Sequence, residues 1–312
     1  MSNMDLNNKA KGFNTHNNLP DSEDQAIDWQ RANKTWWEKN PMRYDFSKKI
    51  TYKEYSKEFY NEIDTRFYNQ VREYMPWSKI PFDNLIDYNL LSNKRVLEIG
   101  VGNGSHAQLL SSKARSYTGI DLTEYSVNST KKRLELFKLN GKILQMDAEK
   151  MNFDDNSFDL IWSWGVIHHT SDTNRALTEI NRILAPKGKV ITMVYYRSPW
   201  IYYVRGFLIF GILKGKLFKG KSLPEILQES VDGALARFYS IKEWKLIITK
   251  HFNIENIKIY GTKHQLIPFL RDGKFKRFLT SLIPDSVGRF ICNRPLVGWF
   301  LVSTFNKKEL QK

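Results

Sequence analysis

The stretch Arg95-Val96-Leu97-Glu98-Ile99-Gly100-Val101-Gly102-Asn103-Gly104-Ser105 decides the fold of this chain. Its apolar residues Val96, Leu97 and Ile99 predict a short buried strand of a parallel sheet. The three alternating glycines let the backbone turn sharply and lie against a ligand, where any Cβ would collide. A helix is expected over residues 105–112, with its free N–H groups pointing at that ligand. The stretch therefore predicts a strand, a glycine loop and a helix that hold a ligand together.

The glycine spacing separates two kinds of nucleotide site. The dinucleotide fingerprint requires G-x-G-x-x-G, whereas here Glu98 precedes glycines spaced by two and two, and Ser105 is followed by His106. The spacing therefore disfavours a dinucleotide-dependent oxidoreductase.

Strand and helix patterns alternate after this stretch. Strands are expected over residues 117–121, 142–147, 158–164, 189–195, 254–260 and 299–305. Helices are expected over residues 123–139 and from the N-cap residue Asp172 to the helix-ending Pro186 and Gly188. Such repeated units predict an α/β fold, a Rossmann-like doubly wound sheet that binds ligands at the carboxyl ends of its strands.

The N-terminal part is expected to cover this sheet. Residues 1–25 are polar and predict a mobile tail without packing contacts, whereas the aromatic-rich residues 26–90 predict a helical lid. Apolar residues spaced by four mark one face of a lid helix over residues 56–75: Phe59, Ile63, Phe67 and Val71. Residues 91–312 are expected to form the main domain.

The cysteine content and the net charge indicate the cellular compartment of the protein and the kinds of partner it could bind. Cys292 is the only cysteine, and residues 1–20 lack the apolar core of a signal peptide, so we expect a cytoplasmic, reduced setting. The net charge of +15 is concentrated in residues 196–312, which hold 21 Lys and Arg against 8 Asp and Glu. This basic third could attract nucleic acid, an anionic membrane or a phosphorylated substrate, or it could be a solvated lysine-rich face.

Two C-terminal segments are expected to be additions to the sheet, a cap over residues 197–240 and a basic insertion over residues 262–296. The cap contains an apolar run at residues 200–213, which is too short to span a bilayer and is interrupted by Arg205. Lysines follow the run at once, as in a helix that lies in a membrane interface. The run also suits a hydrophobic wall for a substrate, or a helix packed on the domain.

Acidic residues end two of the expected strands. Asp121 follows Gly104 by 17 residues, where a carboxylate can accept hydrogen bonds from both hydroxyls of a ribose, or can cap the next helix. Asp147 and the small Ala148 end the next strand, where an acid can bind an adenine amino group without crowding the ring.

Six motifs now stand in order along residues 93–196. They are Glu98-x-Gly100-x-Gly102-x-Gly104, Gly119-Ile120-Asp121, Met146-Asp147-Ala148-Glu149, Asp154-Asp155-Asn156-Ser157-Phe158-Asp159-Leu160-Ile161, Gly165-Val166-Ile167-His168-His169-Thr170 and Glu179-Ile180-Asn181-Arg182-Ile183-Leu184-Ala185-Pro186-Lys187-Gly188-Lys189. This order closely resembles the class I S-adenosylmethionine-dependent methyltransferases, in particular the broad group that includes the ubiquinone and menaquinone C-methyltransferases.

The resemblance implies S-adenosylmethionine as the cofactor and a seven-stranded sheet whose last strand is antiparallel. It implies these cofactor-binding residues: Glu98, Gly100, Gly102 and Gly104 for the methionine part, Asp121 for the ribose, and Asp147 and Ala148 for the adenine. Trp164 is assigned to the same site. Tyr44 could close over the sulfonium as an aromatic lid, or it could be a core residue.

Two further segments also resemble a bacterial subgroup of this family. They are Trp37-x-x-Asn40-Pro41-Met42-x-Tyr44-Asp45 and Asp232-Gly233-Ala234-Leu235-Ala236-Arg237-Phe238-Tyr239-Ser240.

The residues at the end of the fourth expected strand disfavour some classes of methyl acceptor. Family members that methylate exocyclic amines or glutamine amides carry Asn or Asp, two prolines and an aromatic residue there, whereas this chain has Ser163-Trp164-Gly165-Val166. The paired-glutamate loop of protein arginine methyltransferases is missing as well. His168 and His169 follow this strand and are candidates for a general base, although such a pair also serves as structure in the family. No metal is expected, since no third ligand has suitable spacing.

The sequence thus predicts methyl transfer to a small-molecule or lipid-like acceptor, reached at or near an anionic membrane surface. A tRNA or rRNA methyltransferase that uses the basic C-terminal surface is the alternative enzyme, with nucleic acid the less favoured partner. A cofactor-binding protein without turnover is the alternative outside enzymes. Whether oxygen, nitrogen or carbon is methylated stays open.

Overall fold

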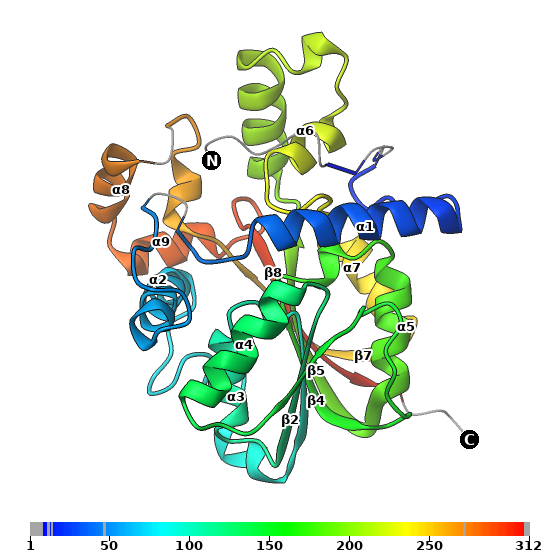
Figure 1. Ribbon diagram of the computed structural model, residues 1–312. Coiled ribbons are helices and arrows are strands. Elements are labelled where there is room, and N and C mark those ends of the chain that lie inside the picture. The colour runs from blue at the N-terminus through cyan, green and yellow to red at the C-terminus, as the bar shows by residue number, and fades with distance from the viewer. Residues whose placement is uncertain (1–8, 11–12, 14, 46–47, 271–272, 309–312) are drawn as a thin grey trace.

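The computed structural model describes residues 9–10, 13, 15–45, 48–270 and 273–308. A twisted sheet forms its centre (Figure 1), with the strand order β3-β2-β1-β4-β5-β8-β7. The strands are β1 (Arg95–Ile99), β2 (Ser116–Asp121), β3 (Lys142–Gln145), β4 (Phe158–Trp164), β5 (Leu184–Tyr196), β7 (Phe252–Tyr260) and β8 (Phe300–Lys307). The predicted Rossmann-like α/β fold is confirmed.

The direction of the strands agrees with the expected family pattern. The strands β1 to β5 pair in parallel, and β8 enters antiparallel between β5 and β7. An additional two-residue strand, β6 (Phe238–Tyr239), pairs in parallel with the end of β5. The sequence did not indicate β6, since a run of two residues carries no alternation to detect.

Successive residues of β1 face opposite sides of the sheet, as the pleat requires. Val96 packs in a cluster with residues of α2 (Lys57–Tyr74), α3 (Ser105–Ser111) and α4 (Glu124–Leu136). Leu97 packs on the other face with residues of α5 (Thr173–Ile183) and α7 (Ile241–Ile248). Both faces are therefore covered, which explains why the strands read as apolar runs.

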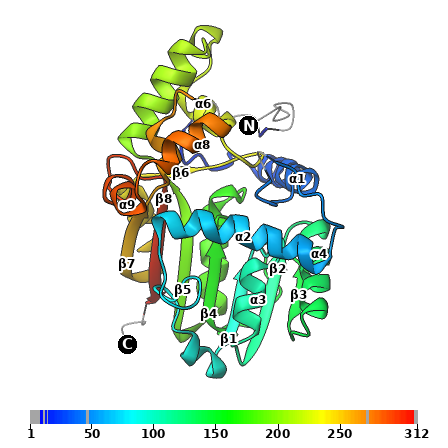
Figure 2. The same cartoon turned by 90° about the vertical axis from the view of Figure 1, so that its left-hand side faces the viewer.

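The helix predicted over residues 56–75 is confirmed as α2. Its N-cap Ser56 accepts a hydrogen bond from the Phe59 backbone N–H, which satisfies a donor that the first turn leaves free. The four apolar residues spaced by four are all buried. In Figure 2, α2 lies across one face of the sheet.

The strand expected over residues 189–195 begins earlier than predicted. The helix α5 ends at Ile183, and β5 starts directly at Leu184, which pairs with Phe158 ahead of a register shift. Pro186 therefore lies within a strand at an irregular position, where its missing N–H disrupts no regular ladder. The sequence pattern treated Pro186 only as a terminator.

The predicted unpacked tail is wrong for the part of residues 1–25 that the structure describes. Phe13 is buried against Trp29, with ring centroids 5.8 Å apart, and the Ala10 N–H donates to the Ala234 carbonyl at 2.8 Å. The helix α1 (Glu23–Lys39) already begins within this range. Residues 1–8, 11–12 and 14 of the predicted tail lie outside the described residues.

The remaining helices lie at the end of the molecule that carries α1 (Figure 1; Figure 2). They are the π-type helix η4 (Trp200–Leu213), the short turn η5 (Leu217–Lys219), α6 (Leu223–Glu229), η6 (Lys263–Leu266), α8 (Lys274–Ser281) and α9 (Asp285–Cys292). Two further short turns are η2 (Tyr88–Asn93) and η3 (Ile167–His169). No helix among the described residues is long and apolar enough to cross a membrane.

Candidate functional site

A cavity of about 270 Å³ lies at the carboxyl ends of β1, β2, β4 and β5, and three residues of α1 line it from above. One group of lining residues follows β1, β2 and β3: Gly100, Gly102, Asp121, Met146, Asp147 and Ala148. A second group, here called the aromatic wall, consists of Tyr44, Phe67, Tyr74, Trp164, Tyr195 and Phe300. The cavity therefore joins a polar, glycine-lined part to an aromatic part.

The glycine loop adopts a conformation that other residues avoid. Gly100, Gly102 and Gly104 have φ values of +82°, +52° and +79°. A Cβ on Gly100 would lie 2.2 Å from Val166 Cγ2, whereas a Cβ on Gly102 would meet no atom within 4 Å. Gly104 does not line the cavity but precedes α3 as its N-cap. The loop thus leaves an open cradle at Gly102, which fits the methionine part of the expected cofactor.

Asp121 lines the cavity, and its carboxylate binds Thr123, which is the N-cap of α4, so Asp121 is not itself the helix cap. Its binding of the ribose stays a prediction. Its Oδ1 accepts hydrogen bonds from the Thr123 N–H at 3.0 Å and the Thr123 hydroxyl at 2.8 Å. Its Oδ2 accepts from the Gly102 N–H at 3.1 Å. A carboxylate can accept about four hydrogen bonds, so capacity for a ribose hydroxyl remains. Burial raises the pKa of Asp121, which these three hydrogen bonds oppose.

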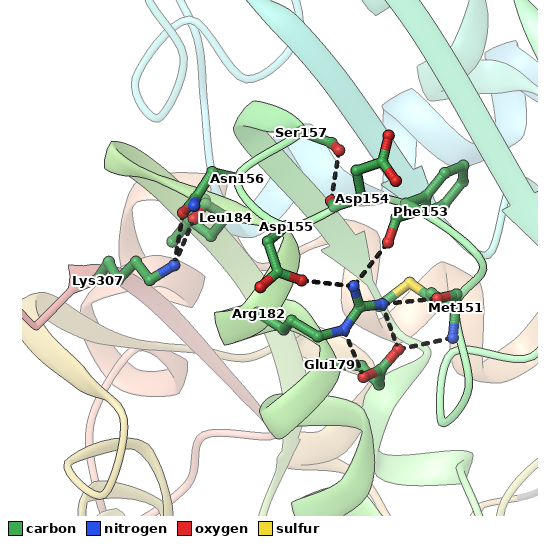
Figure 3. Close-up of polar contacts among 10 residues, drawn as sticks. All are labelled: Met151, Phe153, Asp154, Asp155, Asn156, Ser157, Glu179, Arg182, Leu184 and Lys307. Carbon is green, nitrogen blue, oxygen red and sulfur yellow. Dashed lines mark hydrogen bonds and ion pairs between the residues drawn. The ribbon is translucent and has the colours of Figure 1, made fainter.

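Asp147 and Ala148 line the cavity as expected from the sequence. The Asp147 Oδ1 accepts a hydrogen bond from the Glu149 N–H at 2.8 Å. The loop that follows is held by Arg182, which donates to the carbonyls of Met151 at 2.7 Å and Phe153 at 2.6 Å (Figure 3). This arrangement keeps the adenine side of the predicted site in place.

Glu98 does not line the cavity. Its carboxyl is buried beneath the glycine loop, and the Tyr117 hydroxyl donates to its Oε2 at 2.5 Å. Burial raises the pKa of Glu98 to about 8, so the group is largely protonated at neutral pH. Strand alternation places Glu98 on the face opposite Leu97 and Ile99, where it supports the loop from below.

His168 and His169 differ in whether they line the cavity. His169 lines the cavity, and its Nδ1 lies 2.7 Å from the Leu235 carbonyl, which fixes Nδ1 as the donor and leaves Nε2 as an acceptor. His168 does not line the cavity and contacts Tyr195, with ring centroids 4.1 Å apart and ring planes tilted by 43°. Burial lowers the pKa of both, that of His169 to about 4. Of the two histidines, only His169 therefore lines the cavity.

Tyr44 and Trp164 both belong to the aromatic wall. The Tyr44 ring stacks on Phe67 with centroids 4.9 Å apart, and Trp164 stacks on Trp162 at 5.1 Å. Tyr44 is therefore at once a lining residue and part of a packed aromatic cluster, so both of its predicted roles are compatible.

The lining residues that the sequence did not assign include Gln30, Asn33 and Trp37 of α1, and Asp232. The Asn33 side chain donates to the His169 carbonyl at 2.8 Å, which ties α1 to the cavity. Trp37 and Asp232 each open one of the two segments that resemble the bacterial subgroup, so those segments carried a usable signal. Among the described residues, no cluster of His, Cys, Asp and Glu has the arrangement of a metal site.

The loop that carries Asp232 is tied to the N-terminal segment. The Lys9 ammonium donates to the carbonyls of Gln228, Val231 and Gly233 at 3.1, 2.8 and 2.6 Å. The buried Arg237 guanidinium donates to three further carbonyls, those of Asn18, Thr170 and Ser171. These contacts fix the loop beside His169.

Comparison with known proteins identifies the central part of the chain. Residues 97–192 match the family described as "Methyltransferase domain". A phthiotriol/phenolphthiotriol dimycocerosates methyltransferase of Mycobacterium tuberculosis is 37% identical over 100 residues, which is 31% of this chain and 36% of that protein. A ubiquinone/menaquinone biosynthesis C-methyltransferase, UbiE of Rickettsia rickettsii, is 32% identical over 170 residues, which is 50% of this chain and 66% of that protein. The chain thus spans about a third of the first relative's length and just under two thirds of the second's.

Solved structures agree on the fold. The MccD protein superposes with a TM-score of 0.50 at 15% identity, covering 73% of this chain and 96% of that one. A Haloferax volcanii methyltransferase complex that contains a methyltransferase activator gives a TM-score of 0.50 at 16% identity, covering 80% of this chain and 94% of that one. At such identities the likeness concerns the fold alone.

Proposed function

Because the chain belongs to the class I S-adenosylmethionine-dependent methyltransferases, we propose that it transfers a methyl group to a small, lipid-like acceptor with an aromatic or otherwise apolar reacting part. The observation that carries the proposal is a single cavity in which the glycine cradle opens onto the aromatic wall. The six aromatic rings offer a large apolar surface with a few polar groups, which are three tyrosine hydroxyls and one indole N–H, and this favours a largely apolar acceptor. The names of both relatives, a phthiotriol methyltransferase and a quinone-biosynthesis methyltransferase, point in the same direction.

The residues of the chain align and desolvate the reactants. When bound, S-adenosylmethionine supplies a methyl carbon that its sulfonium activates toward displacement. Gly102 leaves room for the methionine part, and Asp121 retains capacity for the ribose hydroxyls. The ring faces of Tyr44 and Trp164 attract a sulfonium and exclude water from the cavity. Methyl transfer is an in-line displacement, so alignment in a dry cavity supplies much of the acceleration.

We further propose that the acceptor is reached at an anionic membrane surface. Exposed apolar side chains gather on η4 and on α8 and α9, which lie at the same end of the molecule in both views (Figure 1; Figure 2). The most exposed are Tyr203, Leu213, Phe218, Phe275, Phe278, Leu282 and Phe290, all between 59% and 81% exposed. Basic residues such as Lys219 and Lys274 stand among them. Apolar groups that insert and cations that meet anionic headgroups are the two requirements of an interfacial surface.

The test is to incubate the protein with S-adenosylmethionine labelled in its methyl group and either a bacterial lipid extract or total RNA. We expect label in the lipid fraction. Label in RNA instead would favour the nucleic-acid alternative. Tight binding of S-adenosylhomocysteine without label in either fraction would favour the cofactor-binding protein without turnover.

A matched pair of variants ties the activity to the glycine cradle. Gly102 and Gly220 both have positive φ values, +52° and +74°, and a Cβ at either meets no atom within 4 Å. Substituting either by alanine therefore costs a similar amount, about 1 kcal/mol, in unfolding free energy. Only Gly102→Ala is expected to abolish labelling and weaken S-adenosylhomocysteine binding in calorimetry. Equal binding by both variants would exclude the cradle as the cofactor site.

A further inference from the structure

Asp232 is the cavity carboxylate to which neither the sequence motifs nor the expected cofactor assigns a role. Three acids line the cavity, namely Asp121, Asp147 and Asp232. Asp121 and Asp147 follow β2 and β3 and accept hydrogen bonds from neighbouring backbone N–H groups. Among the described residues, by contrast, no group donates a hydrogen bond to the Asp232 carboxylate or forms an ion pair with it. Within the described part of the chain, its acceptor capacity is therefore not taken up by a protein group.

Asp232 lies beside the aromatic wall. Its charge acts on the hydroxyls of both Tyr44 and Tyr195 and contributes to raising the pKa of each. Lys9 and Arg205 are the described cations that act on it. Burial outweighs these cations and raises the pKa of Asp232. A carboxylate in this setting is a stronger base than one in water.

The position of this carboxylate is set by the structure around it. Lys9 binds the carbonyls on both sides, those of Val231 and Gly233. Gly233 has a φ of +85°, and a Cβ there would lie 2.6 Å from His169 Nδ1. The chain therefore passes closely behind His169 only because residue 233 is glycine, and this close approach brings the preceding Asp232 to the cavity.

We propose that Asp232 is a catalytic residue, whose carboxylate faces the methyl-transfer position and takes the proton that the nucleophilic atom of the acceptor loses. The inference rests on the proposed methyl transfer and deepens it, because it requires an acceptor whose reacting atom carries a proton. A lone pair of that atom forms the new bond to the methyl carbon. The carbon–sulfur bond breaks with its electron pair going to sulfur, and the proton moves to an Asp232 oxygen.

His169 is the competing base in the cavity. Its Nε2 is free to accept a proton, but the ring is buried with Arg237 and Lys9 nearby, which disfavours an imidazolium. A neutral His169 can still hold the acceptor by a hydrogen bond. The arrangement therefore assigns proton removal to Asp232 and positioning to His169.

The experiment compares two ligands by calorimetric titration. Sinefungin carries a protonated amine where S-adenosylmethionine carries its methyl sulfonium, whereas S-adenosylhomocysteine has a neutral thioether there. The wild-type protein is expected to bind sinefungin more tightly than S-adenosylhomocysteine. Asp232→Asn is expected to lose about tenfold or more of its affinity for sinefungin, while its affinity for S-adenosylhomocysteine changes by less than about twofold.

Glu229→Gln is the matched control, because Glu229 lies just ahead of this loop, pairs with Lys216 and Lys221, and does not line the cavity. It should keep the wild-type preference. Asp232→Ser, with an unchanged melting temperature, should repeat the loss. An unchanged preference in both Asp232 variants, or an equal loss of both ligands, would overturn the inference. Failure of the wild-type protein to bind either ligand would instead contradict the proposed function.

The rate of methyl transfer distinguishes proton removal by Asp232 from a role of its charge in ligand binding alone. With methyl-labelled S-adenosylmethionine and the lipid extract as acceptor, Asp232→Asn should lower the transfer rate by about a hundredfold or more at an unchanged KM for S-adenosylmethionine. His169→Gln, which keeps a hydrogen-bonding group, should lower it less. Wild-type rates in Asp232→Asn would exclude the carboxylate as the proton acceptor.

Discussion

Glu98 shows, at the scale of one residue, how strand alternation decides whether a side chain lines the cavity. The strand β1 turns Leu97 and Ile99 to one face and Glu98 to the other, so the carboxyl enters an apolar layer. Its one described hydrogen-bond partner is the Tyr117 hydroxyl, and its Oε1 is buried without any among the described residues. The neutral, protonated acid is therefore the stable form in the folded chain.

This burial predicts a pH-dependent stability. The pKa of Glu98 is raised to about 8 in the folded chain from 4.5 in its ordinary state. Below about pH 4.5 Glu98 is protonated in both the folded and the unfolded chain, so its protonation costs no unfolding free energy. Between these values only the unfolded chain releases the proton, so the unfolding free energy falls with rising pH by at most about 1.4 kcal/mol per pH unit. Above about pH 8 the loss levels off.

Glu98→Gln removes this titration, because a glutamine is neutral in both states. We expect its unfolding free energy relative to the wild type to rise by about 2 kcal/mol or more between pH 5 and pH 8, measured by urea unfolding. The exposed Glu135→Gln serves as the control and should show no such trend. A Glu98→Gln difference that is the same at both pH values would show that Glu98 is ionised in the folded chain.

At the scale of elements, one side chain joins the helix α5 to the loop that follows the adenine side of the site. Arg182 donates to the carbonyls of Met151 and Phe153 and pairs with Asp155 and Glu179, both at 2.9 Å (Figure 3). A guanidinium that satisfies two carbonyls and two carboxylates holds its segments more firmly than a surface ion pair does.

We expect Arg182→Met to lower the unfolding free energy by about 1–3 kcal/mol, because it removes four charge-assisted contacts at once. It should also weaken S-adenosylhomocysteine binding, because the loop begins next to Asp147 and Ala148. Arg175→Met is the comparison on the same helix: its ion pair with Glu23 is exposed, 47% and 63%, and its loss should change the unfolding free energy much less. Urea unfolding and calorimetry measure both effects. Equal losses in the two variants would refute the bracing role of Arg182.

At the scale of the whole molecule, the additions to the sheet gather at the end where the cavity lies. The helix α1 lines the cavity, and η4, α8 and α9 carry exposed apolar side chains at the same end (Figure 2). A lipid-like acceptor that leaves a membrane there would have a short path to the aromatic wall.

Flotation with anionic vesicles tests this surface. The wild-type protein should float at low salt and less so at high salt, because exposed cations contribute to the binding. Phe275→Glu combined with Phe278→Glu should bind at least about tenfold more weakly, since two exposed rings of α8 lose the ability to insert. Leu90→Glu, which changes a 61% exposed residue in η2, is the control and should bind like the wild type. Absence of wild-type flotation at low salt would remove the membrane part of the proposal while leaving methyl transfer intact.

Local patterns predicted the central elements well. The bounds of β4 are those expected over residues 158–164, and α2 ends within one residue of its expected limits at both ends. Asp172 caps α5 as predicted, through hydrogen bonds to the N–H groups of Asn174 and Arg175. The bounds of these elements and the cap depend on residues within a few positions along the chain, so local sequence patterns are enough to predict them.

Local sequence patterns could not predict contacts between residues that are far apart in the chain. Phe13 is buried because Leu235 lies more than 200 residues away in the chain but next to it in space. The same distance separates Lys9 from the carbonyls around Asp232. No local periodicity indicates such a partner, which explains why the tail was predicted to be unpacked and Asp232 was assigned no role.

The sequence by itself determined the sheet and the glycine loop, because these follow from alternation, capping and the positive φ that Gly100 and Gly102 adopt. It indicated the cofactor class through the resemblance of its six ordered motifs to a known family. Only the tertiary structure decided which of the predicted site residues share a cavity. Eight of them line it, whereas Glu98, Gly104 and His168 do not; the eight are Tyr44, Gly100, Gly102, Asp121, Asp147, Ala148, Trp164 and His169. The direction of a side chain depends on strand register and on distant packing partners. Strand register and distant packing partners are established only when the chain folds.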